Sequence, residues 1–434
     1  MSRVRERRRL AIPLDDPEAV DAERVGGKAG TLARLRQAGL PVPDGICLTA
    51  DAYRLQLDAA GVSGPAESVG RASEEHEARK LALEVRLGFL RAPLAAAVAD
   101  MLDAAHARMT ETLGRVLAVR SSGLREDAPN ASFAGQFDTF LGNASHADLV
   151  TAVRACWACL WSARALRYMQ SHDVDPARTA MAVLVQRMVE ARAAGGALSR
   201  TAAGGVVVTG TWGLGSALAQ GEVVPDSWVL APDGSLESTA PGRKDQRVVT
   251  TPAGGARPEA VAPELVHAPC LSPDEVVTLG RLVSQIESLL GAPVEVEWAK
   301  DESGFQILQA RPLHVEPPRT RDDVWLRHPG LRGQPAGVGW ATGRACVVIH
   351  EHDLEHVQVG DVLVTQVAGP ALTAVLPRVV GVVAELGGST SHLAALARER
   401  GIPAVLGVGD ATRRIPAGAV VAVDGVTGVV RWVH

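Results

Sequence analysis

The sequence predicts a chain of mixed α/β and α+β class, with two folded parts joined by a proline-rich linker. Its 434 residues give room for about two to four domains. Helical and strand-like apolar segments alternate until the stretch Glu316-Pro-Pro-Arg-Thr-Arg-Asp-Asp, whose composition is typical of a linker. We therefore expect folded parts at residues 1–315 and 338–434, with the linker at residues 316–337.

The composition predicts a folded, cytoplasmic protein. Hydrophobic residues make up 47% of the chain and charged residues 21%, which is too apolar for a disordered protein. The formal net charge is −5 and the basic residues are scattered, so we expect no nucleic-acid partner. The longest uncharged stretch, Thr201–Gly221, is too rich in glycine for a membrane-spanning helix, and the basic run Arg3–Arg9 lacks the apolar segment of a targeting signal. We expect no membrane partner.

The first candidate elements lie near the N-terminus. Gly26-Gly-Lys28 precedes a predicted helix at Ala29–Gln37, where backbone amides and the lysine could bind an anion, although a helix start with a solvated lysine fits equally well. The strand Val116–Val119 then leads Arg120 into a Ser-Ser-Gly turn. A loop of small residues follows at Ala131–Gln136, and a further strand is predicted at Leu184–Val189.

A hairpin is predicted at the end of the N-terminal part. Val294-Glu-Val-Glu-Trp298 alternates, so that Glu295 and Glu297 share one face of a strand. The returning strand, Gln306–Arg311, places Gln309 and Arg311 on one face as well. Carboxylate and amide oxygens beside a guanidinium suit Mg²⁺ with bound phosphate, but ordinary cross-strand pairs explain the pattern too.

The C-terminal part has the pattern of a small β/β/α domain. Glycine-bounded apolar runs predict strands, and a glycine-rich turn precedes a strong helix-forming segment that ends at a glycine. The predicted strands are Gly343–Ile349, Asp361–Thr365, Val379–Ala384 and Ile402–Leu406, and the predicted helix is Leu393–Arg400.

His392 is the most informative residue in this part. It stands in the first turn of the predicted helix, with Thr390 or Ser391 as N-cap. The positive end of the helix dipole disfavours the imidazolium there, which favours a neutral, nucleophilic imidazole. A phosphoryl group on that nitrogen would meet the free amides of the helix start, although an exposed histidine at a cap is the simpler interpretation.

Two further motifs resemble metal or redox sites. Cys156-Trp-Ala-Cys159 has suitable spacing, but the five cysteines include no second such pair, and the flanking apolar residues predict two thiols packed on a helix. His352-Asp-Leu-Glu-His356 matches one metallopeptidase pattern. It lies in a short polar stretch between two predicted strands, where the long helix needed for a zinc site does not fit.

Over nearly its whole length the chain resembles the phosphoenolpyruvate synthase, pyruvate phosphate dikinase and rifampicin phosphotransferase family. Its N-terminal part is similar to the ATP-grasp nucleotide-binding domain of that family, and its C-terminal part to the swivelling phosphohistidine domain. The motifs that carry the resemblance are Val25-Gly-Gly-Lys-Ala-Gly30, Gly39-Leu-Pro-Val-Pro-Asp-Gly45, Val119-Arg-Ser-Ser122, Ala131-Ser-Phe-Ala-Gly-Gln136, Leu308-Gln-Ala-Arg-Pro312, Gly387-Gly-Ser-Thr-Ser-His392 and Ala397-Arg-Glu-Arg-Gly-Ile-Pro-Ala-Val405.

The resemblance implies an ATP-dependent phosphotransferase of the dikinase type. His392 would accept a phosphoryl group from ATP and pass it to a small-molecule acceptor, with AMP and phosphate as products. Lys28, Arg120 and Arg311 would bind the polyphosphate under a loop that contains Gly135 and Gln136. The segment with Gln186, Met188 and Val189 would hold the adenine, and Glu297 and Gln309 would bind Mg²⁺.

The sequence departs from the family pattern at three places. Ser216 replaces the glutamate of the usual Gly-Leu-Gly-Glu, which puts a ribose contact in doubt, and Gly195-Gly-Ala-Leu-Ser-Arg200 replaces Ser-Gly-Val-x-Phe-Thr. The interval Pro312–Val338 is too short for the acceptor domain that the resemblance leads one to expect. The acceptor would then bind to a separate subunit or between the two domains.

Two other functions stay open. Some relatives join small molecules in natural-product pathways through phosphoryl activation, so a condensing enzyme with two co-substrates is the main alternative. The other possibility is a nucleotide-binding regulator with a degenerate site, but the complete set of candidate residues argues against it.

Overall fold

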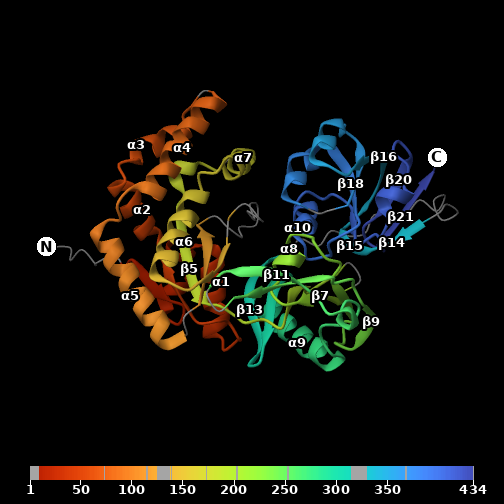
Figure 1. Ribbon diagram of the computed structural model, residues 1–434, viewed down its shortest axis with the longest axis horizontal. Helices are drawn as coiled ribbons and strands as arrows, with labels where there is room; N and C mark the ends of the chain where they lie inside the picture. Colours follow the sequence, from red (N-terminus) through yellow and green to blue (C-terminus); the bar gives the residue numbers. More distant parts are fainter. Residues whose placement is uncertain are drawn as a thin grey trace. The chain divides into compact units, whose positions relative to one another are not determined.

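The computed structural model describes residues 9–72, 74–113, 116–124, 137, 139–172, 174–201, 204–251, 254–313, 330–366 and 369–433. The chain forms two compact units. The first contains residues 1–189, 250–256 and 306–311, and the second contains residues 190–249, 257–305 and 312–434. The predicted mixed fold is confirmed, because each unit combines helices with β-sheets (Figure 1).

The first unit is built on a five-stranded antiparallel sheet of order β1-β2-β5-β3-β4. Strand β3 lies beside β5 and is buried along its whole length, so the polar residues on β3 are held against other protein groups. The strands are β1 (Ala11–Pro13), β2 (Gly45–Leu48), β3 (Leu117–Gly123), β4 (Thr139–Asn143) and β5 (Met181–Arg187).

Seven helices accompany this sheet among the described residues: α1 (Ala22–Gln37), α2 (Ala50–Ala59), α3 (Ser63–Val69), α4 (Glu75–Arg91), α5 (Ala96–Leu113), α6 (His146–Cys159) and α7 (Ala163–Ser171). Helix α6 begins with a capping box between Ser145 and Asp148 and packs Trp157 against Phe89 of α4. Cys156 and Cys159 are buried on α6 as free thiols, which confirms the packed interpretation of that pair.

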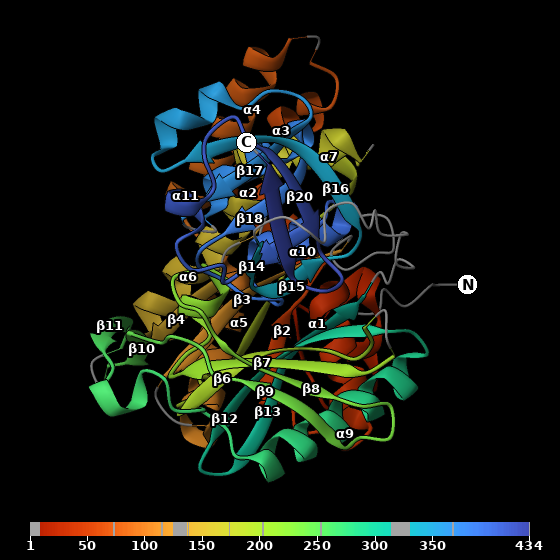
Figure 2. The ribbon, with the colours of Figure 1, turned by 90° about the vertical axis from the view of Figure 1, so that its right-hand side faces the viewer.

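The second unit contains a six-stranded sheet of order β13-β12-β6-β7-β8-β9. Helix α9 (Pro273–Leu290) begins with a capping box at Ser272 and covers one face of this sheet (Figure 2). The strands are β6 (Ala193–Leu198), β7 (Val206–Trp212), β8 (Asp226–Leu230), β9 (Leu236–Ala240), β12 (Val294–Asp301) and β13 (Gly304–Pro312), and residues 306–311 of β13 are grouped with the first unit. A short helix α8 (Ser216–Ala219) and a two-stranded sheet of β10 (Gln246–Thr250) and β11 (Ala256–Ala260) complete this region.

A buried ion pair fixes the start of β8. The Asp226 carboxylate lies 2.5 Å from the Lys244 ammonium, and both side chains are 0% exposed. Asp226 also accepts hydrogen bonds from the backbone N–H groups of Gly242, at 2.7 Å, and Cys270, at 2.8 Å. Each buried charge thus has a close partner of opposite charge. Through these bonds the Asp226 carboxylate joins the start of β8 to the segments of residues 242–244 and Cys270.

The C-terminal residues form an eight-stranded sheet of order β14-β21-β20-β16-β17-β18-β19-β15, with β16 to β19 parallel. Its strands are β14 (Gly330–Arg332), β15 (Gln334–Gly337), β16 (Trp340–Val348), β17 (Asp361–Thr365), β18 (Val379–Ala384), β19 (Ala404–Leu406), β20 (Val420–Asp424) and β21 (Val429–Val433). Helix α10 (His392–Glu399) connects β18 to β19, and α11 (Ala411–Arg414) follows β19. Strands β14 and β15 occupy the end of the interval that the sequence predicts as linker.

The remaining elements are short 3₁₀ helices: η1 (Pro17–Val20), η2 (Pro176–Arg178), η3 (Pro263–Leu265), η5 (Glu351–His356), η6 (Pro370–Ala374) and η7 (Leu376–Arg378). The predicted pair His352 and His356 lies on η5, a single short helix that agrees with the rejection of a zinc peptidase site. In the part of the chain that the structure describes, no helix is both long enough and apolar enough to cross a membrane.

Candidate functional site

The Gly26-Gly-Lys28 turn is packed directly against β3. Gly26 has φ 80 and ψ 165, and a Cβ atom on it would lie 2.1 Å from the Ser122 carbonyl oxygen. The Ser122 hydroxyl accepts from the Ala29 N–H at 3.0 Å and donates to the Val25 carbonyl at 2.8 Å. The predicted helix therefore begins with a kinked turn that only glycine allows, inside a longer α1.

Lys28 and Arg120 are buried cations, each two residues along the chain from the contact between Gly26 and Ser122. Lys28 is 5% exposed and donates from Nζ to the Ser121 carbonyl at 3.0 Å. Arg120 is 8% exposed and donates to the Leu308 carbonyl and, at 3.3 Å, to the side-chain oxygen of Gln309. Both cations are thus held in place within the protein, and an anion bound beside them would form charge-assisted hydrogen bonds.

Gln309 and Arg311 follow each other on β13 with one residue between them. Their positions put both side chains on one face of the strand. Both are half-buried, and the bond from Arg120 to Gln309 brings the predicted polyphosphate and metal residues of the first unit together.

The predicted adenine-binding segment lies at the end of β5. Gln186 is 2% exposed, and its side-chain amide donates to the Pro43 carbonyl at 2.9 Å. The Met188 N–H donates to the Val116 carbonyl at 3.1 Å, and Met188 and Val189 are buried. The amide of Gln186 therefore holds the loop before β2, and the segment as a whole is fixed by backbone bonds.

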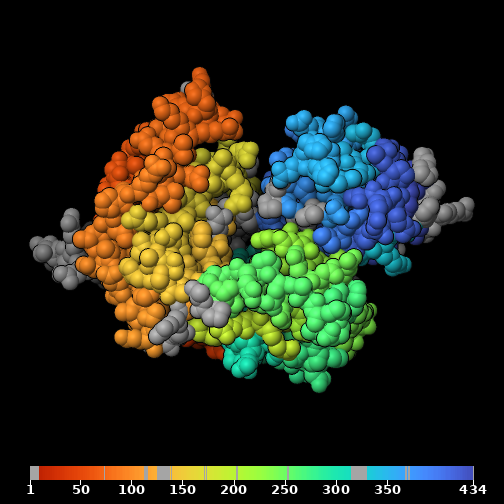
Figure 3. All heavy atoms as spheres, in the orientation of Figure 1, coloured from red at the N-terminus to blue at the C-terminus, as the bar shows by residue number. Residues whose placement is uncertain are grey.

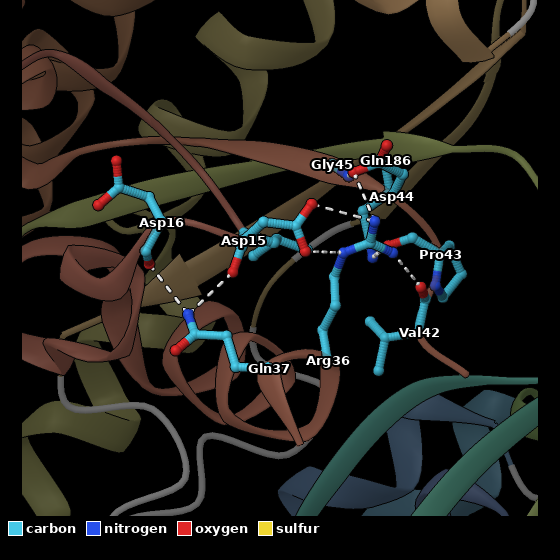
Figure 4. A network of polar contacts seen from close by, with 10 residues as sticks. Asp15, Asp16, Arg36, Gln37, Val42, Pro43, Asp44, Gly45 and Gln186 are labelled. Atoms are coloured by element: carbon cyan, nitrogen blue, oxygen red, sulfur yellow. Dashed lines mark hydrogen bonds and ion pairs between the residues drawn. The ribbon is translucent and has the colours of Figure 1, made fainter. Parts of the chain in front are cut away.

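A polar network on α1 fixes the same loop (Figure 4). Arg36 bonds the carboxylate of Asp15, donates to the Val42 carbonyl at 2.8 Å and lies 3.2 Å from the Asp44 carboxylate. The Asp15 hydrogen bond raises the pKa of the Arg36 guanidinium. The Asp44 carboxylate in turn accepts from the Gly45 N–H at 2.9 Å, so the network leads into β2 beside Gln186.

Glu297 belongs to the second unit and is exposed on β12, whereas Glu295 is buried. The register of the sheet opposes Glu297 to Gly196 of β6, and Gly196 to Thr209 of β7. Opposed residues of antiparallel strands share a face, so Glu297, Gly196 and Thr209 form one cross-strand row. Among the described residues no group of three or more His, Cys, Asp or Glu side chains could hold a metal ion.

Gly135 and Gln136, which the sequence predicts to cover the nucleotide, lie outside the described residues.

His392 is the first residue of α10 and is half-buried. Ser391 is the N-cap, and its hydroxyl accepts from the Ala394 N–H at 3.4 Å, which decides between the two predicted caps. The preceding Ser389 N–H donates to the Gln334 side chain at 3.4 Å. The imidazole therefore stands at the positive end of a helix dipole, after a glycine-containing turn, where a phosphoryl group is electrostatically favoured.

Two residues near His392 make contacts that the sequence does not single out. The Thr390 hydroxyl is hydrogen-bonded to the Thr209 hydroxyl of β7. Arg398, on α10, donates from Nη2 to the Glu295 carboxylate of β12 at 2.9 Å, and their side chains are only 7% and 9% exposed. The sequence pattern that bears on these contacts is the pair of carboxylates, Glu295 and Glu297, at alternate positions of β12.

Comparison with known families gives two matches. The family described as pyruvate phosphate dikinase, AMP/ATP-binding domain, matches residues 22–325. The family described as PEP-utilising enzyme, mobile domain, matches residues 357–428. The first match covers the Gly26-Gly-Lys28 turn and the hairpin of β12 and β13, and the second covers the loop and helix of His392.

Curated relatives extend over nearly the whole chain. A probable phosphoenolpyruvate synthase of Methanothermobacter thermautotrophicus is 32% identical over 94% of this chain and 61% of its own length. A phosphoenolpyruvate synthase of Aeropyrum pernix is 34% identical over 98% of this chain and 58% of its own length. The chain thus spans about three fifths of the length of these relatives.

Proposed function

The chain belongs to the pyruvate phosphate dikinase and phosphoenolpyruvate synthase family, and on that premise we propose that it is an ATP-dependent phosphotransferase with His392 as its phosphoryl carrier. In the balanced step, ATP, water and His392 give phosphohistidine, AMP and phosphate. One phosphoryl group of ATP forms a bond to an imidazole nitrogen, and another is transferred to water. The phosphohistidine then donates its group to a small-molecule acceptor.

The position of His392 carries the proposal. A half-buried imidazole at the first position of α10 keeps its neutral form favoured by the helix dipole, and a neutral imidazole is the nucleophile that attack on phosphorus requires. The same backbone amides stabilise the negative charge of a phosphoryl group once it is bound.

The nucleotide is proposed to bind on the first unit. Lys28, Arg120 and Arg311 would neutralise the polyphosphate, which is supported by the burial of Lys28 against β3 and of Arg120 against β13. The segment with Gln186, Met188 and Val189 would border the adenine, with its backbone held by the bonds to Val116 and Asp44. Gly135 and Gln136 would lie over the phosphates.

Mg²⁺ is the proposed cofactor. The candidate donors, the exposed carboxylate of Glu297 and the amide oxygen of Gln309, are hard oxygens that fit this ion, which is held by one or two protein groups together with substrate phosphates. When bound, Mg²⁺ would neutralise phosphate charge. The protein's own residues would position ATP and hold the imidazole.

Intact-protein mass spectrometry after incubation with ATP and Mg²⁺ tests the proposal. We expect an acid-labile phosphoryl adduct and one AMP per adduct, both lost in His392→Ala and after removal of Mg²⁺ with EDTA. His356→Ala is the matched control, because it removes a histidine of the exposed η5 helix and should leave the adduct unchanged. An adduct that persists in His392→Ala, or ATP turnover without AMP, would contradict the proposed relay.

The acceptor is tested on the isolated phosphoprotein. Because the curated relatives are named phosphoenolpyruvate synthases, pyruvate is the first small molecule to add. We expect an acceptor to remove the adduct from His392 within the time of one turnover and to appear phosphorylated. If pyruvate leaves the adduct intact, other small molecules, alone or with a separate acceptor-binding subunit, are the next candidates.

A further inference from the structure

The loop that carries His392 is fixed to the segment that leads into β8, in the same unit. The Gly387 N–H donates to the Val223 carbonyl at 3.1 Å. A Cβ atom on Gly388 would lie 2.5 Å from the Pro225 ring. The Pro225 carbonyl accepts from the Gln334 side chain at 2.9 Å. In the view of Figure 1, α8 and α10 are drawn on the side of β7 away from α9, and Figure 3 shows the same face with all heavy atoms.

Gly196 lies under the Thr390 side chain. A Cβ atom on Gly196 would lie 2.5 Å from the Thr390 Cβ and 2.7 Å from its hydroxyl and methyl, and these three are its nearest neighbours. The close contact with Thr390 therefore requires a glycine on β6. Gly196 stands in the cross-strand row that begins with Glu297, the proposed metal ligand. Thr390, two residues before His392, therefore packs onto that row.

Arg398 makes the second connection. Its Nη1 donates to the Ser389 carbonyl and, at 3.0 Å, to the Ala336 carbonyl, while its Nη2 donates to Glu295. Glu295 and Glu297 are two residues apart and share a face of β12. One guanidinium thus ties the His392 loop to the strand that carries Glu297. Because both charges are buried, removing either partner of this ion pair is costly.

We propose that Gly196, Thr209 and Glu295 form a docking face at which the phosphohistidine domain receives its phosphoryl group, and that Thr390 and Arg398 are the positioning residues that hold His392 there. This inference rests on the proposed function. Arg398 and Thr390 act through the placement of the imidazole, and neither takes part in the bond changes. Docking by one ion pair, hydroxyl contacts and close glycine packing keeps the contact polar and releasable, which a carrier that serves a second site requires.

Gly196→Ala tests the docking face, because the three atoms nearest to its added methyl all belong to Thr390. Fluorescent labels at Leu289→Cys and Val359→Cys, two exposed positions of the second unit, report docking by energy transfer independently of catalysis. We expect Gly196→Ala to lose the docked signal and to form phosphohistidine about a hundredfold more slowly, since misplacement by about an ångström costs that much. ATP affinity should stay within about twofold, because the substitution leaves the side chains of Lys28, Arg120 and Arg311 in place. Gly409→Ala, with no atom within 4 Å of the new methyl, is the matched control.

Glu295→Arg is the second variant, since it places like charges against each other at Arg398 and leaves β6 untouched. We expect loss of the docked signal and of phosphohistidine formation, with a milder loss in Glu295→Gln. Glu302→Arg, on the exposed turn of the same hairpin, controls for charge reversal. If Gly196→Ala and Glu295→Arg form phosphohistidine as fast as their control variants, the docking inference is overturned and the proposed function stands. No phosphohistidine in the unmodified protein would instead refute the proposed function, and the inference with it.

Discussion

Gly26→Ala is expected to disrupt the turn that presents Lys28, without removing any polar group. The backbone at Gly26, with φ 80 and ψ 165, lies in a region that is essentially limited to glycine. The added Cβ would also lie 2.1 Å from the Ser122 carbonyl oxygen, more than an ångström closer than ordinary contact. The turn must therefore move away from β3, and Lys28 must move with it.

The magnitude follows from these two terms. The unfavourable backbone conformation costs about 1–3 kcal/mol, and the clash with a carbonyl on a fully buried strand adds to it. We expect a loss of about 3 kcal/mol in the free energy of unfolding of the first unit, whereas Gly39→Ala should cost only about 1 kcal/mol. Gly39 is the matched control because it has φ 82 but no atom within 4 Å of a new Cβ.

Urea titration of both variants and calorimetric titration with ATP measure the two effects. A displaced Lys28 should weaken ATP binding by about tenfold or more, which corresponds to about 1.4 kcal/mol, in Gly26→Ala only. If Gly26→Ala matches Gly39→Ala in stability and in ATP affinity, the reasoning from the Ser122 contact is refuted.

Three further predictions concern other parts of the molecule. Asp226→Ala should lower the free energy of unfolding of the second unit by about 3–5 kcal/mol in urea titration, because the buried Lys244 loses its carboxylate; a loss below about 1 kcal/mol would contradict this. Burial raises the pKa of the Cys47 and Cys270 thiols, and all five cysteines are buried and free. Ellman's reagent should therefore detect the five thiols only after denaturation. Rapid labelling of the native protein would contradict the buried packing of these thiols. Hydrogen bonds from Ser145 lower the pKa of the Asp148 carboxyl, so its contribution to stability is present above the ordinary pKa of aspartate and is lost as the pH falls through the lowered value. Asp148→Ala should therefore destabilise the protein at pH 7, and this effect should shrink as the pH falls below the ordinary pKa; an effect that is independent of pH would exclude this role.

Local sequence patterns predict two strands to the residue. The strands at Asp361–Thr365 and Val379–Ala384 coincide with β17 and β18, because β-branched apolar runs bounded by polar and glycine residues encode buried strands within a few residues. The helix predicted at Ala29–Gln37 lies within the second part of α1, and a first part that Asp21 caps precedes it at Ala22. The non-helical backbone of Gly26 separates the two parts, in agreement with the glycine pair, which is typical of helix breaks.

Strands β14 and β15 show what local pattern cannot supply. Both lie in an interval rich in proline and glycine that the sequence indicates as linker. They are strands only because Leu331 pairs with Val430 and Pro335 with Val405, far along the chain. Short strands of low intrinsic propensity become ordered when a sheet offers them a free edge.

The sequence by itself determined that His392 begins a capped helix and that Glu295 and Glu297 alternate onto one face, because the backbone periodicities of helices and strands act within a few residues. Only the tertiary structure decided how these two carboxylates differ. Glu295 is buried against Arg398, 103 positions away in the sequence, while Glu297 stays exposed. Such pairings depend on which surfaces pack together after the elements have formed, and no local spacing encodes that choice.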